Sequence, residues 1–204
     1  IERGAVMEDS FGLEHALWFA NNKEDAHEEP TFKRSRAHEY VAREVNAVRN
    51  AVGCSEVANF SKHRITGTGA RKYLDNILAG TIPRPGRISL SPMLSPKGRL
   101  IGDLTVACID EEKFMLFGSG ALQEFHRRWF ENFLPEEEVE YKNFSDEFHG
   151  IAISGPQSRE LLSRICRDDV AAESLKFRDI RETHVAGVPC ILNRLSFTGE
   201  LGFE

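Results

Sequence analysis

The chain has 204 residues, enough to bury the core of one large domain or two small ones. With 41% hydrophobic and 28% charged residues it has an ordinary globular composition, which excludes a disordered or fibrous protein. The net charge of −6 argues against a nucleic-acid partner, because affinity for phosphate backbones depends on clustered Lys and Arg. No apolar run reaches the roughly 20 residues of a membrane-spanning helix, so we expect no membrane partner.

The N-terminal segment, residues 1–36, is predicted to be an irregular linker that enters a domain. It contains one apolar island, Gly12–Phe19, and then a charged stretch that ends at Pro30. The chain begins with Ile1 rather than Met and ends directly after a motif, so we expect it to be part of a longer polypeptide.

Helix and strand patterns then alternate along the chain. Apolar residues at helical spacing predict an amphipathic helix over Ala37–Val52, closed by Gly53. A loose alternation predicts a strand over Val57–Thr66. The helix pattern returns over Ala70–Leu78 and ends before Gly80.

From Arg87 to Phe117 the pattern is that of an antiparallel meander. Apolar alternations are separated by the turn Ser95–Gly98 and by the acidic turn Asp110–Lys113, and both turns are hairpin signals. Aromatic and aliphatic residues at helical spacing predict a helix over Gly120–Leu134, with its aromatic stripe in the core. The charge run Glu136–Glu140 is predicted to be a solvated loop.

The last third of the chain repeats the alternation. A strand over Gly150–Ser154 leads through Gly155 into a helix, and residues 175–204 alternate as strands around Gly187. The two strand–glycine–helix units, residues 57–80 and 150–166, are candidates for a pseudo-repeat, although their identities are too few to claim a duplication. These patterns predict an α+β fold with substantial antiparallel sheet.

Side chains that commonly carry metal or redox chemistry are dispersed. The four cysteines form no C-x-x-C pair, so we expect small buried hydrophobes in a reducing compartment, the cytoplasm or the mitochondrial matrix, and no metal site. The sequence contains no H-E-x-x-H, G-x-S-x-G or G-x-G-x-x-G pattern. Zinc hydrolase, serine hydrolase and dinucleotide-binding mechanisms are therefore not indicated.

The first candidate functional residue is Asp103, within the strand-like segment Gly98–Val106. Aspartate is depleted from strands because its carboxylate costs free energy when it leaves water. One interpretation is that Asp103 points to solvent on the polar face of a hairpin. The other is that its carboxylate faces a pocket, where it accepts a hydrogen bond or holds a cationic amine.

The second candidate lies in the last nine residues, Ser196–Glu204. Gly199 and Gly202 allow a tight bend or close approach of the backbone to a ligand, and Glu200 and Glu204 share one face if the chain is extended. A carboxylate can accept two parallel hydrogen bonds from the ring N–H and exocyclic amine of a pterin. The alternative is a pair of exposed strand carboxylates.

In this order the two motifs resemble the glycine-cleavage T-protein, or aminomethyltransferase, family from about residue 38 to the end. The family pattern G-G-x-x-D-D-L-x-V is similar to Gly98–Val106, and the family aspartate near the reactive nitrogens of tetrahydrofolate falls on Asp103. The family pattern Y-T-G-E-x-G-x-E is similar to Phe197–Glu204, which implies that Glu204 anchors the pterin. Phe197 replaces the usual Tyr, so a ring can pack against folate without a phenol hydrogen bond.

The match is partial, because Gly102 stands where the family has an acid and Arg99 where it has a glycine. A further segment, Ile151–Arg159, resembles a family segment that we expect to be structural. The segment Arg3–Phe19 is similar to the connection between a flavin oxidoreductase domain and the folate domain in dimethylglycine and sarcosine dehydrogenases.

This resemblance implies that residues 1–36 are a linker similar to the end of a flavin oxidoreductase domain and that residues 37–204 are the N-terminal part of an aminomethyltransferase-like folate-binding domain. The implied cofactor is tetrahydrofolate, with FAD only in an upstream domain. The implied partners are a methylated amine or aminomethyl donor and the flavin domain, and the implied activity is one-carbon transfer. A noncatalytic regulatory module and a folate-dependent demethylase that needs no flavin remain alternatives.

Overall fold

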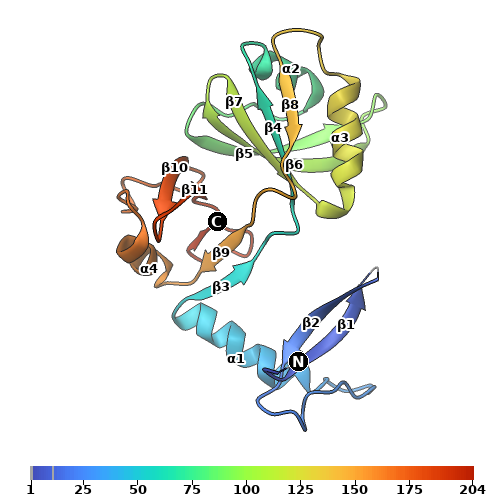
Figure 1. Ribbon diagram of the computed structural model, residues 1–204, viewed down its shortest axis with the longest axis vertical. Helices are drawn as coiled ribbons and strands as arrows, with labels where there is room; N and C mark the ends of the chain where they lie inside the picture. The colour runs from blue at the N-terminus through green and yellow to red at the C-terminus, as the bar shows by residue number, and fades with distance from the viewer. Residues whose placement is uncertain (1, 11) are drawn as a thin grey trace.

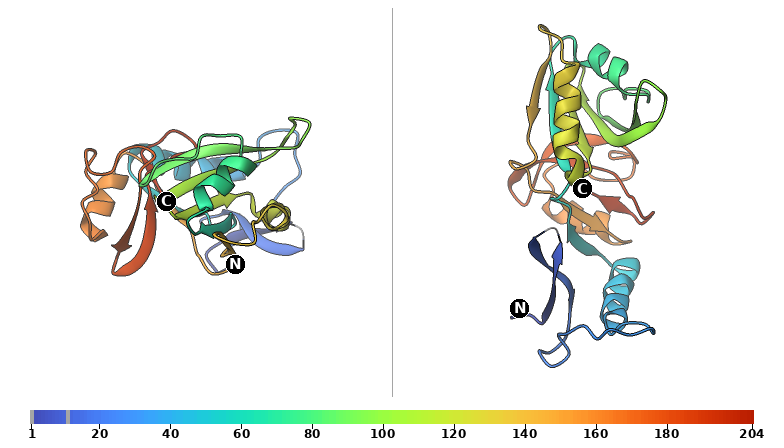
Figure 2. Two further views of the ribbon diagram at one scale, coloured as in Figure 1. Left: turned by 90° about the horizontal axis from the view of Figure 1, so that it is seen from above. Right: turned by 90° about the vertical axis from the view of Figure 1, so that its right-hand side faces the viewer.

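The computed structural model describes residues 2–10 and 12–204, and Ile1 and Phe11 lie outside them. The fold is α+β with antiparallel sheets, as predicted. The N-terminal elements lie at one end of the molecule and a five-stranded sheet lies at the other (Figures 1 and 2). Within the described ranges, the helices are all too short or too polar to cross a membrane.

The N-terminal segment contains a β-hairpin, so the prediction of an irregular segment over residues 1–36 was wrong for residues 5–10 and 13–19. Strands β1 (Ala5–Ser10) and β2 (Leu13–Phe19) pair antiparallel, and residues 20–36 contain neither helix nor strand. Trp18 packs against Tyr40 of α1 (Ala37–Asn50), with ring centroids 4.9 Å apart. The hairpin is therefore attached to the predicted first helix through a small core of its own.

The predicted meander forms the centre of the large sheet. Its strand order is β5-β6-β7-β4-β8, and all neighbours are antiparallel. The strands are β5 (Arg87–Leu94), β6 (Leu100–Asp110), β7 (Lys113–Gly118), β4 (Ser61–Thr66) and β8 (Glu140–Asn143). The edge strand β8 was not predicted, because its residues are polar and the preceding charge run is typical of a loop.

Helices cover one face of this sheet, which we call the inner face. They are α2 (Ala70–Ile77) and α3 (Gln123–Asn132), the latter preceded by the 3-10 turn η1 (Gly120–Leu122). Buried Leu74 and Phe130 from the helices pack with Leu104 and Leu116 from the strands. This is the largest core of the protein, and it fixes the inner face of the sheet.

A second lobe is built from the C-terminal third with one earlier strand. It contains β9 (Ile151–Ser154), α4 (Ser158–Ile165), β10 (Ile180–Val185), β11 (Val188–Asn193) and β12 (Gly202–Phe203), with β3 (Gly53–Glu56). The strands form a sheet of order β12-β9-β3 and a hairpin of β10 and β11. Leu162, Leu175, Leu192 and Phe203 form its core.

The glycines of the two strand–glycine–helix units have the same backbone geometry. Gly67 has a φ of 116° and Gly155 a φ of 123°, in the region that disfavours any residue with a Cβ. Each carbonyl accepts a 3.0 Å hydrogen bond from the first turn of the helix, from Ala70 N–H and Ser158 N–H respectively. The backbone geometry at the glycine is therefore the same in both units, and this similarity is limited to the turn between strand and helix.

Candidate functional site

Asp103 lies on the outer face of the large sheet, opposite α2 and α3. Side chains alternate along a strand, and Leu104 and Val106 are buried in the inner core, so Asp103 and Thr105 face outward. Asp103 is exposed and pairs with Pro92 of the edge strand β5. The carboxylate is thus available to solvent or to a ligand resting on the outer face.

Only part of the outer face is covered by protein. Ile88, Ala107 and Met115 pack against Ile180 of β10, which closes the half of the face near the second lobe. In the other half, Leu90 is 67% exposed and lies on the same face as Asp103. The open half therefore presents apolar surface beside a carboxylate, a combination suited to a flat ligand with a polar edge.

Glu204 occupies a different kind of environment. Its backbone exchanges two hydrogen bonds with Asn193, at 2.7 and 2.9 Å, which ties the end of β12 to β11. The side chain is half-buried, and burial raises the pKa of its carboxyl group. Among the described residues it has no hydrogen-bond or ion-pair partner, and the neighbouring buried Asn193 Oδ1 also has none. A ligand with N–H donors would satisfy these oxygens.

Glu200 does not share this environment, because the segment is not extended and the condition under which both glutamates would lie on one face is not met. Residues 197–201 form a bend, and Gly199 has a φ of 95°. The Thr198 hydroxyl donates a hydrogen bond to Glu200, which lowers the pKa of that carboxyl group. Glu200 is therefore already satisfied within the bend, whereas Glu204 is not.

Phe197 lies in the same bend and is 99% exposed. The bend is held from inside, because Leu201 C=O accepts hydrogen bonds from Gly155 N–H at 2.9 Å and from the Ser158 hydroxyl at 2.8 Å. An aromatic ring this exposed contributes nothing to the core. It is free to pack on a ligand.

A continuous backbone ladder joins the two lobes that carry Asp103 and Glu204. Beyond the Asn193–Glu204 pair, Arg194 N–H donates to Asp179 C=O at 2.9 Å. At the start of β10, Ile180 N–H donates to C=O of Gly86, the residue directly before β5, at 3.0 Å. Figure 1 shows the C-terminus between the large sheet and the second lobe. The two predicted site residues thus belong to one hydrogen-bonded framework.

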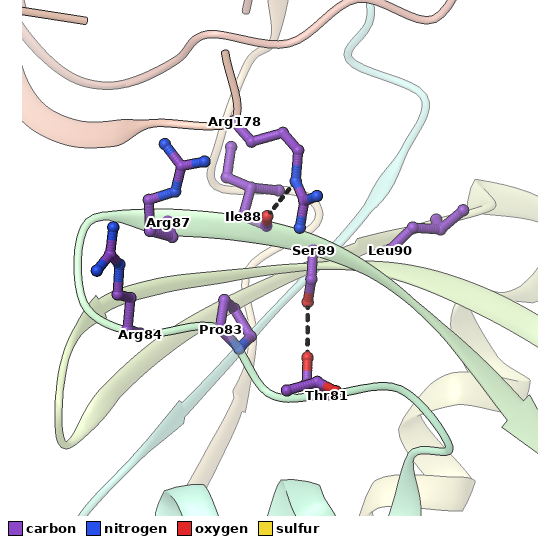
Figure 3. Close-up of a pocket in the computed structure, with 8 residues that line it drawn as sticks. All are labelled: Thr81, Pro83, Arg84, Arg87, Ile88, Ser89, Leu90 and Arg178. Atoms are coloured by element: carbon purple, nitrogen blue, oxygen red, sulfur yellow. Dashed lines mark hydrogen bonds between the residues drawn. The ribbon is translucent and has the colours of Figure 1, made fainter. Parts of the chain in front are cut away.

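An open groove of about 500 Å³ lies at the free edge of β5, where this ladder reaches the large sheet. It is lined by Arg84, Arg87 and Arg178 together with Leu90 (Figure 3). Sequence reasoning missed the groove, because Arg178 is far from the other arginines along the chain. The segment Pro83–Arg87, with two arginines around a Pro-Gly turn, was the available signal.

A buried polar cluster was also missed. His63 and His126 are fully buried in the inner core, with ring centroids 5.8 Å apart. His63 Nδ1 lies 2.9 Å from the Tyr141 hydroxyl and His126 Nδ1 lies 3.2 Å from the Ser61 hydroxyl. Desolvation lowers the pKa of His63 to about 4. For His126, desolvation lowers the pKa although nearby Asp103 raises it. Both rings are therefore neutral at pH 7.

No metal centre is evident among residues 2–10 and 12–204. The described residues contain no group of three or more His, Cys, Asp or Glu side chains that could hold a metal ion. All four cysteines are free thiols. Cys108 is fully buried and Cys166 and Cys190 are partly buried, but Cys54 is exposed, so the expectation of buried cysteines was wrong for Cys54. The site is thus composed of two carboxylates, an exposed ring, an open sheet face and a basic groove.

The sequence model of the GCVT N-terminal domain family matches residues 1–204. The chain belongs to this family. It is 34% identical over 197 residues to mitochondrial dimethylglycine dehydrogenase of Mus musculus. The aligned region covers 95% of this chain and 22% of that protein. It is 32% identical over 164 residues to an aminomethyltransferase of Natranaerobius thermophilus, which covers 79% of this chain and 44% of that protein.

Solved structures bear out the GCVT-type fold. The glycine cleavage system aminomethyltransferase T from Bartonella henselae matches 99% of this chain and 49% of its own, with a TM-score of 0.76 and 19% identity. A chain of the heterotetrameric sarcosine oxidase from Corynebacterium sp. U-96 matches with a TM-score of 0.56 and 20% identity. The match covers 85% of this chain and 85% of the sarcosine oxidase chain. The chain spans about a fifth of the dehydrogenases and under half of the aminomethyltransferases.

Proposed function

We propose that this GCVT domain binds tetrahydrofolate and takes part in one-carbon transfer, as the folate-binding part of an enzyme like dimethylglycine or sarcosine dehydrogenase. The observation that carries the proposal is the half-buried Glu204 carboxylate, whose oxygens have no partner among the described side chains. Leaving an acceptor in such a state costs free energy that a bound donor recovers. Membership of the family supports the assignment.

Glu204 is proposed to hold the pterin. The 2-aminopyrimidinone edge of a pterin offers a ring N–H and an exocyclic amine in parallel, which match the two oxygens of one carboxylate. Phe197, with its ring fully exposed, would cover one face of the heterocycle. The absence of a hydroxyl on this ring removes a hydrogen bond and leaves its packing surface intact.

Asp103 is proposed to act on the reacting nitrogen. Tetrahydrofolate supplies, when bound, a nucleophilic amine that accepts the one-carbon unit. The exposed Asp103 carboxylate on the open outer face would orient that amine and stabilise the positive charge that develops on it. A positioned carboxylate contributes about 10² to 10⁴ in rate when it acts in acid–base catalysis.

Residues 1–36 are proposed to connect the folate domain to a flavin oxidoreductase domain that carries FAD and oxidises the methylated amine. The β1–β2 hairpin supports this role, because Leu13, Leu17 and Phe19 are at least 45% exposed on it. Apolar side chains gathered on one element are typical of a surface covered by another domain. The relatives described as mitochondrial support a location in the matrix.

A noncatalytic regulatory domain is the second candidate. It is favoured by Gly102, which stands immediately before Asp103 where the family pattern has a second acid. A single exposed carboxylate is a weaker proton acceptor than a coupled pair whose mutual repulsion raises one pKa. In this case folate would bind and no transfer would follow.

The proposal is tested by isothermal titration calorimetry with tetrahydrofolate. Glu204→Gln is expected to weaken binding at least tenfold, and Glu200→Gln, which removes a charge from the same bend, to have little effect. Asp103→Asn is expected to retain binding and to slow one-carbon transfer by about 10² to 10⁴ in the polypeptide that includes the flavin domain. Equal losses for Glu200→Gln and Glu204→Gln would overturn the assignment of the pterin site.

Stability provides an independent readout for Glu204. Its pKa is raised in the folded state by burial, so the ionised carboxylate destabilises the ligand-free protein above that pKa, and protonation relieves the cost as the pH falls. Glu204→Gln is therefore expected to raise the free energy of unfolding at pH 7.5, with a gain that shrinks toward pH 4. A variant that is less stable at pH 7.5 would mean that a partner already compensates Glu204.

A further inference from the structure

We infer that a hollow at the β4–β8 edge of the large sheet binds a small zwitterionic amino acid, with opposite charges that hold its carboxylate and its ammonium group. The hollow has a volume of about 340 Å³ and is lined by Arg64, Thr66, Glu140, Tyr141 and Lys142. Neither of the two sequence motifs contains any of these residues. The inference goes beyond the proposed function, because it assigns a second ligand to another part of the sheet.

The charged side chains of the hollow lie on the outer face of the sheet, at the edge opposite β5. Ile65 is fully buried in the inner core, so the alternation along β4 directs its neighbours Arg64 and Thr66 outward. Arg64 pairs with Lys142 of β8, and Thr66 pairs with Glu140, so the four side chains share one face. Figure 1 shows β8 beside β4 in the large sheet.

Arg64 lacks an anionic partner. Its guanidinium carbon lies 4.4 Å from the centre of the Phe144 ring. Its Nε is buried and has no hydrogen-bond partner among the described residues. A buried donor in this state costs free energy until an acceptor reaches it. The Nε–H and one terminal N–H of a guanidinium point in the same direction, and together they match the two oxygens of a carboxylate.

A second cation increases the need for a carboxylate at this position. Lys142 Nζ lies 4.2 Å from the centre of the same Phe144 ring. Arg64 and Lys142 are directly opposite in register, and like charges in such a pair repel each other. Lys142 pairs with Glu147 at 3.0 Å, and within the described part of the chain this is the only ion pair made by a residue that lines the hollow. The positive charge of Arg64 is therefore available to a ligand.

Glu140 supplies the opposite charge in the same hollow. Its side chain is exposed and forms no hydrogen bond or ion pair with a described residue. Glu140 is the diagonal neighbour of Arg64 across the two strands, at a separation of about 7 to 8 Å. In an α-amino acid one carbon carries both the carboxylate and the ammonium group. The carboxylate would meet Arg64 while the ammonium group donates to Glu140 and to the Thr66 hydroxyl, whereas Glu140 would repel a simple anion.

The hollow is separate from the proposed folate site. The row Arg64, Met115 and Ala107 crosses β4, β7 and β6, and Ala107 is four residues from Asp103 along β6. These separations correspond to about 10 Å across the strands and about 13 Å along them. Ile180 packs over Met115 and Ala107 between the two places. An amino acid in the hollow would therefore not compete with a ligand at Asp103.

The experiment is a titration of the protein with glycine, followed by ¹⁵N NMR of the Arg64 Nε–H group. This signal is expected to shift saturably, and acetate and methylammonium, which each carry one of the two charges, should bind at least tenfold more weakly. Arg64→Gln and Glu140→Gln should each weaken glycine binding about tenfold, with the Thr66 amide as the reporter when Arg64 is replaced. The matched controls Arg128→Gln and Glu173→Gln remove exposed charges elsewhere and should leave the affinity unchanged.

Three results would overturn the inference. The first is the absence of a saturable shift with glycine in the wild-type protein, a measurement that does not depend on the folding of any variant. The second is acetate or methylammonium that binds as tightly as glycine, and the third is tighter glycine binding by Glu140→Gln, since either would identify a site for a single charge. Tetrahydrofolate affinity should be the same for Glu140→Gln and the wild type, so a failure of the proposed function is observed separately.

Discussion

Replacing Gly155 by alanine should be the most disruptive small substitution in the second lobe. Gly155 connects β9 to α4, and its φ of 123° is strained for any residue with a Cβ. A Cβ at this position would lie 2.5 Å from Ala51 C=O, and Val48 C=O would be closer still. Both are backbone atoms at the end of α1, which cannot turn aside as a flexible side chain would.

The magnitude follows from comparing two glycines. Gly187, in the turn between β10 and β11, has a φ of 81° and no atom within 4 Å of an added Cβ. Gly187→Ala should therefore cost only the backbone strain, about 1 kcal/mol. Gly155→Ala adds displacement of two backbone carbonyls, about 1 to 3 kcal/mol as for other overpacked sites. We expect a total of about 2 to 4 kcal/mol.

Urea unfolding followed by circular dichroism measures both variants at pH 7.5. Gly155→Ala should lower the midpoint with an unchanged slope, and its thermal midpoint should fall by about 10 °C. Since Gly155 N–H also holds Leu201 C=O, the variant should weaken folate binding through the Phe197 bend. A loss of stability no larger than that of Gly187→Ala would refute the contribution of the carbonyl contacts.

Two further predictions concern residues at opposite extremes of burial. Because burial lowers the pKa of His63 from 6.5 to about 4, the unfolded chain binds a proton more readily, and stability is complete above pH 6.5 and lost as the pH falls. From pH 6.5 to 5 the wild type should lose about 2 kcal/mol of unfolding free energy at this residue. In urea unfolding, the unfolding free energy of His63→Leu should depend less steeply on pH. An equal dependence on pH in the two proteins would contradict a neutral buried ring. Phe197→Ala should change the unfolding free energy by less than about 0.5 kcal/mol, because the ring is 99% exposed, and it should weaken tetrahydrofolate binding in calorimetry. Unaltered affinity would remove Phe197 from the site.

The large sheet and its helices were predictable because the periodicity of the hydrophobic residues and the residues in the turns indicate the same elements there. The turn Ser95–Gly98 separates two clear alternations, and its Gly98 N–H bonds Ser95 C=O at 2.8 Å. The N-terminal hairpin was missed because a register shift between Val6 and Met7 interrupts the alternation that identifies a strand. Strand β8 was missed because it lies at a polar edge, where Tyr141 alone packs against the main core.

The individual site residues were predictable only in part. Asp103 could be placed on a strand, but which face it occupies depends on α2 and α3 covering the other. The distinction between Glu200 and Glu204 depends on the bend at Gly199 and on contacts with Asn193, which no local pattern encodes. Arg178 meets Arg84 and Arg87 because the start of β10 adds to the edge of β5, a long-range pairing.

The backbone ladder from Glu204 to β5 makes the two lobes mechanically dependent on each other. Its bonds at Asn193 and Arg194 lie within the second lobe, its Ile180–Gly86 bond crosses to the large sheet, and the Ile88–Ile180 core lies beside that crossing. Rotation of the second lobe as a rigid body would have to break this ladder and open that core. We therefore expect the second lobe not to rotate on ligand binding, so that the distance between the Asp103 and Glu204 carboxylates is already set in the ligand-free protein.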